Sequence, residues 1–213
     1  MTNSMYFDPY FRRPAKSFVR LFHASPDAPA VDIYLGNQLV ARNLNFKDFT
    51  RYLTVAPGPY NIRVFPAGKT TDPIINSNYT FKPNAILTIA AAGMLKNIKL
   101  LPFEEPKMPS IPGKSYIRFI HLSPNTPAVD ITLPNGNVLF KNISFEKSSD
   151  YISISQGTYT LQARPTGTNK IILNVPNVRI RPNRILSVYA VGLLDGKPPL
   201  QVVIPLDGSS YIG

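Results

Sequence analysis

The stretch Phe18-Val-Arg-Leu-Phe-His-Ala-Ser-Pro-Asp-Ala-Pro-Ala-Val-Asp-Ile33 occurs twice in this chain. It returns about 98 residues later as Tyr116-Ile-Arg-Phe-Ile-His-Leu-Ser-Pro-Asn-Thr-Pro-Ala-Val-Asp-Ile131. Self-similarity over a whole domain length indicates a duplicated fold unit. Residues that both copies share are therefore expected to serve the architecture first.

The two copies can be aligned to the end of each. The alignment needs one inserted residue, in the turn 134–137 of the second copy. We predict two domains, at 18–103 and 116–206, each within the usual size range of a small domain. A linker rich in proline, 104–115, is expected to join them as a semi-rigid spacer. The prediction is completed by an N-terminal arm, 1–17, and a C-terminal tail, 207–213.

Composition and local pattern favour an all-β fold. Hydrophobic residues make up 44% of the chain, enough for two cores, and the 22 prolines and 12 glycines punctuate it at short intervals. Segments 60–65 and 159–164 alternate apolar and polar residues, as strands with one buried face do. The nearly apolar run 86–95 is too short to span a bilayer and is expected to be a buried strand. We predict two tandem antiparallel β-sandwiches of the Ig-like, Greek-key kind.

The repeated motif resembles the bacterial domain-of-unknown-function family 4397. The resemblance rests on the pattern Val/Ile-Arg-x-x-His-x-Ser-Pro-x-x-Pro-x-Val-Asp-Ile and on a Gly-x-Tyr strand entry such as Gly58-Pro-Tyr60. It implies a β-sandwich, usually in surface or envelope proteins and often in tandem, with no established activity. Many members carry an export signal, whereas the N-terminus of this chain does not show the charged-then-apolar order of one.

The repeated motif holds the chain's two histidines, and its His, Ser and Asp residues suggest two alternatives. A hydrolase would need a histidine, His23 or His121, to converge with the following serine, Ser25 or Ser123, beside an oxyanion pocket. The favoured interpretation is structural: the histidine closes a core edge, and the serine forms a turn before proline. Because the chain has no cysteine and no metal-binding or phosphate-binding motif, we predict no metal site and no cofactor.

Two further motif positions carry opposite charges. If the strands on either side of the Ser-Pro loop pair as a hairpin, Arg20 can meet Asp32, and Arg118 can meet Asp130. Such a pair would set the register of the strands rather than bind a ligand.

The chain has a net charge of +11, and most of the excess positive charge lies in its second half. Residues 107–213 hold 11 basic and 5 acidic residues. Arg179, Arg181 and Arg184 replace residues 80, 82 and 85 of the first copy, so the fold itself does not require them. This stripe is a candidate patch for an anionic polymer. The absence of a nucleic-acid-binding signature argues against specific nucleic-acid recognition, and an ordinary basic surface is the alternative.

The arm before the first repeat is rich in aromatic residues. Tyr6, Phe7, Tyr10 and Phe11 have no counterpart before the second copy. They are expected either to fold back over the first sandwich or to dock on a neighbouring molecule by strand addition.

Three classes of function follow from these observations. The leading hypothesis is a non-enzymatic structural protein that associates into a homo-oligomer or polymer in a bacterial cell-surface or spore-surface layer, made in the cytoplasm of the producing or mother cell. The alternative is a binding module for an anionic glycan or wall polymer. The hydrolase using His23/Ser25 or His121/Ser123 is the least favoured. No transmembrane segment is predicted.

Overall fold

The computed structural model describes residues 14–212, and within them the chain is all-β apart from two single turns of 3₁₀-helix. The first domain contains β1 (Ser17–His23), β2 (Val31–Leu35), β3 (Gln38–Leu44), β4 (Leu53–Val55), β5 (Gly58–Pro66), β6 (Ile75–Phe81), β7 (Ile86–Ala92) and β8 (Lys99–Glu104). The second contains β9 (Lys114–His121), β10 (Val129–Thr132), β11 (Val138–Ile143), β12 (Ile152–Ser155), β13 (Gly157–Pro165), β14 (Leu173–Ile180), β15 (Ile185–Val191) and β16 (Gln201–Val203). The 3₁₀ turns are η1 (Leu95–Asn97) and η2 (Gly208–Ser210).

Each domain is a sandwich of two four-stranded sheets. The sheet orders are β4-β1-β7-β8 over β3-β2-β5-β6 in the first domain, and β12-β9-β15-β16 over β11-β10-β13-β14 in the second. The predicted all-β tandem sandwich is confirmed. The same strand order in both domains agrees with the duplication read from the sequence.

Two of the four sheets are mixed, which differs from the antiparallel arrangement that we predicted, whereas β3-β2-β5-β6 and β11-β10-β13-β14 are antiparallel throughout. β1 pairs in parallel with β7, from Phe18 opposite Ile86 to His23 opposite Ala91, and β9 pairs in parallel with β15. The first and seventh strands are joined through the whole domain rather than by a tight turn. Their relative direction is therefore not fixed by hairpin geometry, which was the only local signal available in the sequence.

The Ser-Pro loop crosses between sheets and does not close a hairpin. β1 belongs to one sheet of the first sandwich and β2 to the other, and β9 and β10 are separated in the same way. The arginine of each motif therefore lies on a different sheet from the aspartate. This topology removes the basis for the predicted arginine–aspartate pairs.

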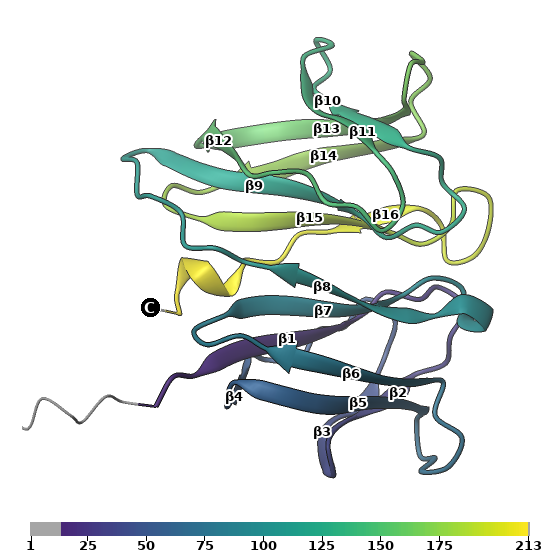
Figure 1. The fold of residues 1–213 in the computed structure, drawn as a ribbon. Helices are drawn as coiled ribbons and strands as arrows, with labels where there is room; N and C mark the ends of the chain where they lie inside the picture. The colour runs from purple at the N-terminus through teal and green to yellow at the C-terminus, as the bar shows by residue number, and fades with distance from the viewer. Residues whose placement is uncertain (1–13, 213) are drawn as a thin grey trace, which may run out of the picture.

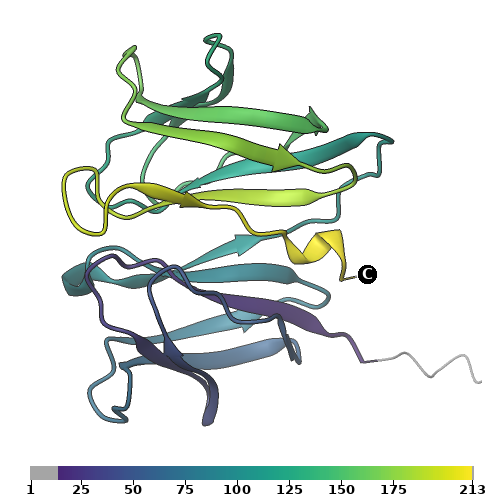
Figure 2. The same ribbon diagram turned by 180° about the vertical axis from the view of Figure 1, so that it is seen from behind.

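The two sandwiches stack as four layers of sheet, with β1, β7 and β8 of the first domain facing β9, β15 and β16 of the second (Figures 1 and 2). Each sandwich has its own apolar core, and a third core lies between the domains. Every residue of β7 and β15 is buried because these strands are covered on both faces. The domains therefore form one continuous packed body.

One tyrosine dominates the core between the domains. Tyr189 of β15 is fully buried, and its ring packs edge-on against Phe22 at a centroid distance of 5.1 Å and lies 5.8 Å from the ring of Phe49. The equivalent position in the first domain is Ala90. In the core between the domains, the second domain therefore has the large Tyr189 where the first has the small Ala90. Such a difference lets the two facing sheets pack closely.

Candidate functional site

The two motif histidines hold their own loops in place. His23 ends β1 and His121 ends β9, and their exposed fractions are 0% and 1%. Their Nε2 atoms lie 2.9 Å from the carbonyl oxygen of Pro29 and 3.1 Å from that of Pro127. Burial lowers the pKa of both rings. A neutral imidazole that donates to a loop carbonyl is consistent with the structural interpretation.

The motif serines do not form hydrogen bonds through their hydroxyls to these histidines. Ser25 Oγ donates to the carbonyl of Gly93 at 2.6 Å, and Ser123 Oγ donates to that of Gly192 at 2.7 Å. Each hydroxyl thus holds the Ser-Pro loop, which follows β1 or β9, against the glycine that follows β7 or β15. The geometry gives the hydrolase hypothesis no support, because neither serine has the histidine base that nucleophilic attack requires.

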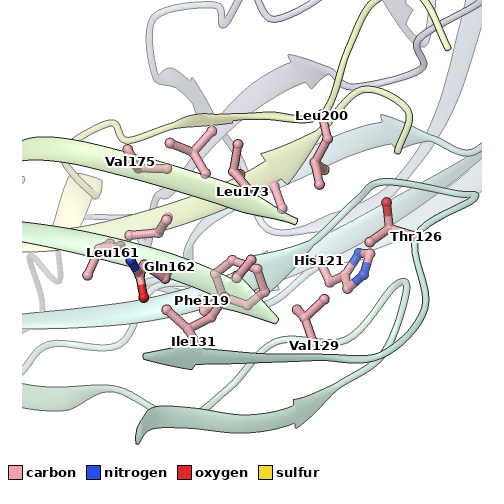
Figure 3. Close-up of a pocket in the computed structure, with 14 residues that line it drawn as sticks. Phe119, His121, Thr126, Val129, Ile131, Leu161, Gln162, Leu173, Val175 and Leu200 are labelled. Carbon is pink, nitrogen blue, oxygen red and sulfur yellow. The ribbon is translucent and has the colours of Figure 1, made fainter. Parts of the chain in front are cut away.

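A small apolar cavity lies beside His121 (Figure 3). Its volume is about 20 Å³, and its lining comes almost entirely from the core of the second sandwich, including Phe119, Leu161 and Leu200. A space of this size holds about one water molecule. It is a packing defect rather than a substrate site.

The motif aspartates bind backbone amides. Asp32 accepts hydrogen bonds from Asn43 N at 2.7 Å and Gly68 N at 2.9 Å, and Asp130 accepts from Asn142 N at 2.7 Å. Both asparagines have positive φ, of 50° and 55°, at irregular points of the ladder between the second and third strands. The aspartates therefore fix the kink at which β3 and β11 bend.

The motif arginines face the other domain. Arg20 donates from Nη1 to the carbonyl of Leu206 at 2.9 Å, and Arg118 donates from Nη1 to the carbonyl of Glu104 at 2.7 Å. The predicted pairs Arg20–Asp32 and Arg118–Asp130 do not form. The two arginines are instead equivalent members of a buried polar cluster across the domain interface, with exposed fractions of 5% and 4%.

The acidic members of this polar cluster are Glu105 and Asp207. The amide of Glu105 donates to Ile86 O and that of Asp207 to Ile185 O, which shows that the two residues are equivalent. Arg20 Nη2 lies 3.6 Å from Glu105 Oε1 and 3.9 Å from Asp207 Oδ1. Both carboxylate side chains are fully buried, so the cluster is a structural ion network rather than a surface feature.

Hydroxyl groups complete the polar cluster. Thr88 and Ser187 donate to the carboxylates of Glu105 at 2.6 Å and Asp207 at 2.9 Å, and Tyr52 donates to Glu105 at 2.5 Å. The Tyr151 hydroxyl likewise donates a hydrogen bond to the carboxylate of Asp207. Burial, and then the charge of Glu105, raises the pKa of Asp207 to about 6.

Sequence reasoning missed most of this polar cluster. Tyr52 and Tyr151 occupy equivalent positions of the two copies, as do Thr88 and Ser187, but no motif in the sequence marks these residues as partners. Glu105 lies in the segment predicted as the linker and Asp207 in the predicted tail, outside the duplicated register. An alignment extended past β8 and β16 is the signal that finds them.

The basic stripe is exposed on the second domain. Arg179 lies in β14 between the buried residues Val178 and Ile180, so its side chain points outward. Arg181 and Arg184 follow in the turn to β15, and Ser115 Oγ holds this turn by donating to Arg181 O at 2.5 Å and accepting from Arg184 N at 3.1 Å. Within residues 14–212, none of the three arginines forms an ion pair.

The first domain treats the same positions differently. Thr80 and Ala85 replace two of the arginines, and Lys82, which replaces Arg181, forms an ion pair with Glu104 at 2.6 Å. The residue equivalent to Glu104 in the second domain is Leu206. Among the described residues, the second domain therefore has more cations at this edge, and no acid forms an ion pair with them.

Other sequence predictions fall outside the described chain or concern features it does not show. The aromatic arm residues Tyr6, Phe7, Tyr10 and Phe11 lie outside the described residues. Between residues 14 and 212, no helix is long and apolar enough to cross a membrane, and no three His, Asp or Glu side chains are grouped to hold a metal ion.

This architecture defines a tandem β-sandwich protein whose two domains share a buried polar interface. The chain belongs to the family described as "Domain of unknown function (DUF4397)", whose model matches residues 17–132 and 130–208. The resemblance seen in the repeated motif is thus confirmed. The first match extends into β10, so its boundary does not coincide with that of the first sandwich.

No curated protein matches the chain. Among solved structures, the chain is similar to the carbohydrate-binding module CBMbc (family CBM26) of Eubacterium rectale Amy13K in complex with maltoheptaose. The identity is 11%, the TM-score is 0.29, and the match covers 91% of this chain and 99% of that chain. A score this low carries no inference about what this chain binds.

Proposed function

We propose that this protein is a non-catalytic binding module that contacts an anionic polymer, such as a bacterial surface glycan or wall polymer, through the basic edge of its second domain. The observation that carries the proposal is the exposed, unpaired set Arg179, Arg181 and Arg184. Burial of the motif histidines supports a non-catalytic role.

The geometry of the stripe suits a repeating anion. Arg179 and Arg181 are two residues apart on an extended segment, so their Cα atoms are separated by about 7 Å along the chain. Each guanidinium presents a planar set of donors that matches phosphate and carboxylate oxygens. The buried interface between the domains keeps this edge in a fixed position on a body of two sandwiches.

The test is binding of polymers of matched length and different charge. Isothermal titration with poly(glycerol phosphate), polygalacturonate and neutral dextran should show binding of an anionic polymer only. Affinity should fall as salt is added, because exposed charges are screened within about 10 Å at 0.1 M ionic strength. The variant Arg179→Thr/Arg181→Thr/Arg184→Ala should lose binding at least tenfold.

A charge-matched control separates the stripe from the overall net charge. The variant Lys69→Thr/Lys96→Thr/Lys170→Thr also removes three exposed cations but leaves the stripe intact. It should bind as the wild type does. Equal losses in both variants, or preference for the neutral dextran, would contradict the proposal.

The leading sequence hypothesis, a self-associating surface-layer protein, depends on the aromatic arm. Because the arm lies outside the described residues, this hypothesis and the cell-surface or spore-surface location stay predictions. Polymer binding and self-association are compatible, since they use different parts of the chain.

A further inference from the structure

A hollow of about 150 Å³ lies next to the basic stripe, between the linker and the turn that joins β14 to β15. The linker residues Met108–Ile111 form one wall, and the turn residues Asn183 and Arg184 form another. The C-terminal turn η2, which Figure 1 shows between the two sandwiches, contributes Ser209 and Ser210. Three segments that are far apart in sequence thus meet around it.

Among the described residues that line the hollow, the two that carry a charge at neutral pH, Lys114 and Arg184, are both basic. Lys114 donates from Nζ to Ser155 Oγ at 2.8 Å, and the Arg184 side chain has no hydrogen-bond or ion-pair partner among residues 14–212. No aspartate or glutamate is in the lining. A cationic site without an internal counter-charge attracts an anion.

One hydroxyl beside the hollow is buried without a partner among residues 14–212. Ser209 Oγ has no hydrogen bond there, whereas Ser210 Oγ accepts from Ile185 N and donates to Ile185 O. Leaving a buried hydroxyl unsatisfied is unfavourable. Ser209 lines the hollow although its Oγ is covered, so a rotation about χ1 would let this hydroxyl donate to a ligand oxygen and remove the penalty.

The first domain has a corresponding hollow with a different charge. It is lined by Asn84 and Ala85, the counterparts of Asn183 and Arg184, together with Glu104, Glu105 and Lys107. Alanine thus stands in place of the arginine, and the lining holds two acids and one lysine. Because the same fold builds both hollows, the basic lining of the second is not needed for folding.

We propose that the hollow of the second domain binds one tetrahedral oxyanion, a phosphate or sulfate group, through the Arg184 guanidinium, the Ser209 hydroxyl and the Lys114 ammonium. This proposal rests on the proposed function, for which the group would be part of the polymer that runs over Arg179 and Arg181. The volume equals about five waters at about 30 Å³ each, which leaves room for an oxyanion with part of its hydration shell. Arginine and lysine are the side chains that most often bind phosphate oxygens.

The experiment uses the full chain and inorganic phosphate at low ionic strength. Two-dimensional amide NMR should show saturable shifts at Arg184, Ser209 and Ser210, with sulfate acting similarly and acetate more weakly. Arg184→Ala, which introduces the residue found in the first domain, should lower the affinity for phosphate at least tenfold. Ser209→Ala should lower this affinity several-fold. Lys82→Ala, which removes an exposed charge on the first domain, should leave it unchanged. The amide spectra of the unliganded variants show that each is folded.

The outcomes separate this inference from the proposed function. If no saturable shift occurs near Arg184 and Ser209, or if Arg184→Ala leaves the shifts intact, the oxyanion site is wrong even when the polymer binds through the stripe. If phosphate binds with the predicted dependence on Arg184 but no anionic polymer does, the site takes free phosphate and the polymer function is wrong.

Discussion

Arg20 of the first sandwich donates a hydrogen bond to the carbonyl oxygen of Leu206 at the end of the second, at 2.9 Å. The second sandwich returns the contact, since Arg118 donates to Glu104 O at 2.7 Å. The two domains therefore meet through equivalent surfaces, as subunits do in a twofold dimer. The repeated motif stabilises the contact between the copies as well as each copy itself.

Replacing Arg20 by alanine should strongly destabilise the chain. Arg20 lies within ion-pair distance of both buried carboxylates, at 3.6 and 3.9 Å, and its guanidinium also lies over the rings of Phe49 and Tyr52, 4.6 and 4.8 Å from their centroids. Breaking a buried ion pair by removing one partner costs about 3–5 kcal/mol. Urea denaturation should show a loss of that order, and a smaller loss for Arg118→Ala, because one of its terminal nitrogens has no partner. The exposed Arg42→Ala is the control, and a loss below about 1 kcal/mol for Arg20→Ala would contradict this assignment.

The stability of the chain should depend on pH in two opposite ways. Burial raises the pKa of Asp207 from 3.8 to about 6, so between these values the folded chain binds the proton more tightly than the unfolded chain does. The contribution of Asp207 is therefore fully present below about pH 4 and is lost as the pH rises through 6. Burial lowers the pKa of His23 and His121 below 6.5, so their contribution is present above 6.5 and is lost as the pH falls.

Asp207→Asn separates these two contributions. The amide cannot ionise, so the loss of stability that ionisation of Asp207 causes as the pH rises from 4 to 7 should be absent from the variant. The histidine contribution alone should then make the stability of the variant rise between pH 5 and 7. Urea melts at several pH values measure both slopes. A variant with the same pH dependence as the wild type between pH 4 and 7 would contradict the role assigned to Asp207.

Filling the cavity beside His121 should stabilise the second sandwich. Val188, which lines this cavity and is 2% exposed, is equivalent to Ile89 of the first domain, which is 1% exposed. Val188→Ile adds one methylene toward the empty space and should stabilise by up to about 0.8 kcal/mol. The matched reverse change, Ile89→Val, should lower the free energy of unfolding by about 0.5–1.5 kcal/mol. Destabilisation by Val188→Ile would mean that the cavity cannot admit the added carbon.

The sequence predicted what repeats locally and missed what depends on distant partners. The strands and turns followed from residue periodicity and from the duplication, and the buried strand β7 (Ile86–Ala92) followed from the nearly apolar run 86–95. The pairing of Arg20 did not, because β1 and β2 are close in sequence but belong to different sheets. The interface between the domains was also missed, although the nearly continuous apolar runs of β7 and β15 are typical of strands buried on both faces.

The basic edge was predictable as a set of residues but not as a site. Arg179, Arg181 and Arg184 stood out because only one copy has them. Their lack of acidic partners depends on Leu206 replacing Glu104, at positions that follow loops of different length in the two copies. Comparison of the two domains in space shows this equivalence directly.

Deleting residues 1–15 should leave both sandwiches folded and should weaken self-association. β1 begins at Ser17, so the deletion removes no strand residue. The four aromatic side chains of the arm would each contribute about 1.5–3 kcal/mol if buried against a neighbouring molecule, less the entropy of ordering the segment. Light scattering over a range of protein concentrations compares the full-length and shortened chains, and a chain with Tyr6, Phe7, Tyr10 and Phe11 all changed to Ser tests the aromatic residues without shortening the arm. If all three chains remain monomeric at high concentration, the self-association hypothesis is wrong, and the polymer-binding function proposed for the basic edge stands alone.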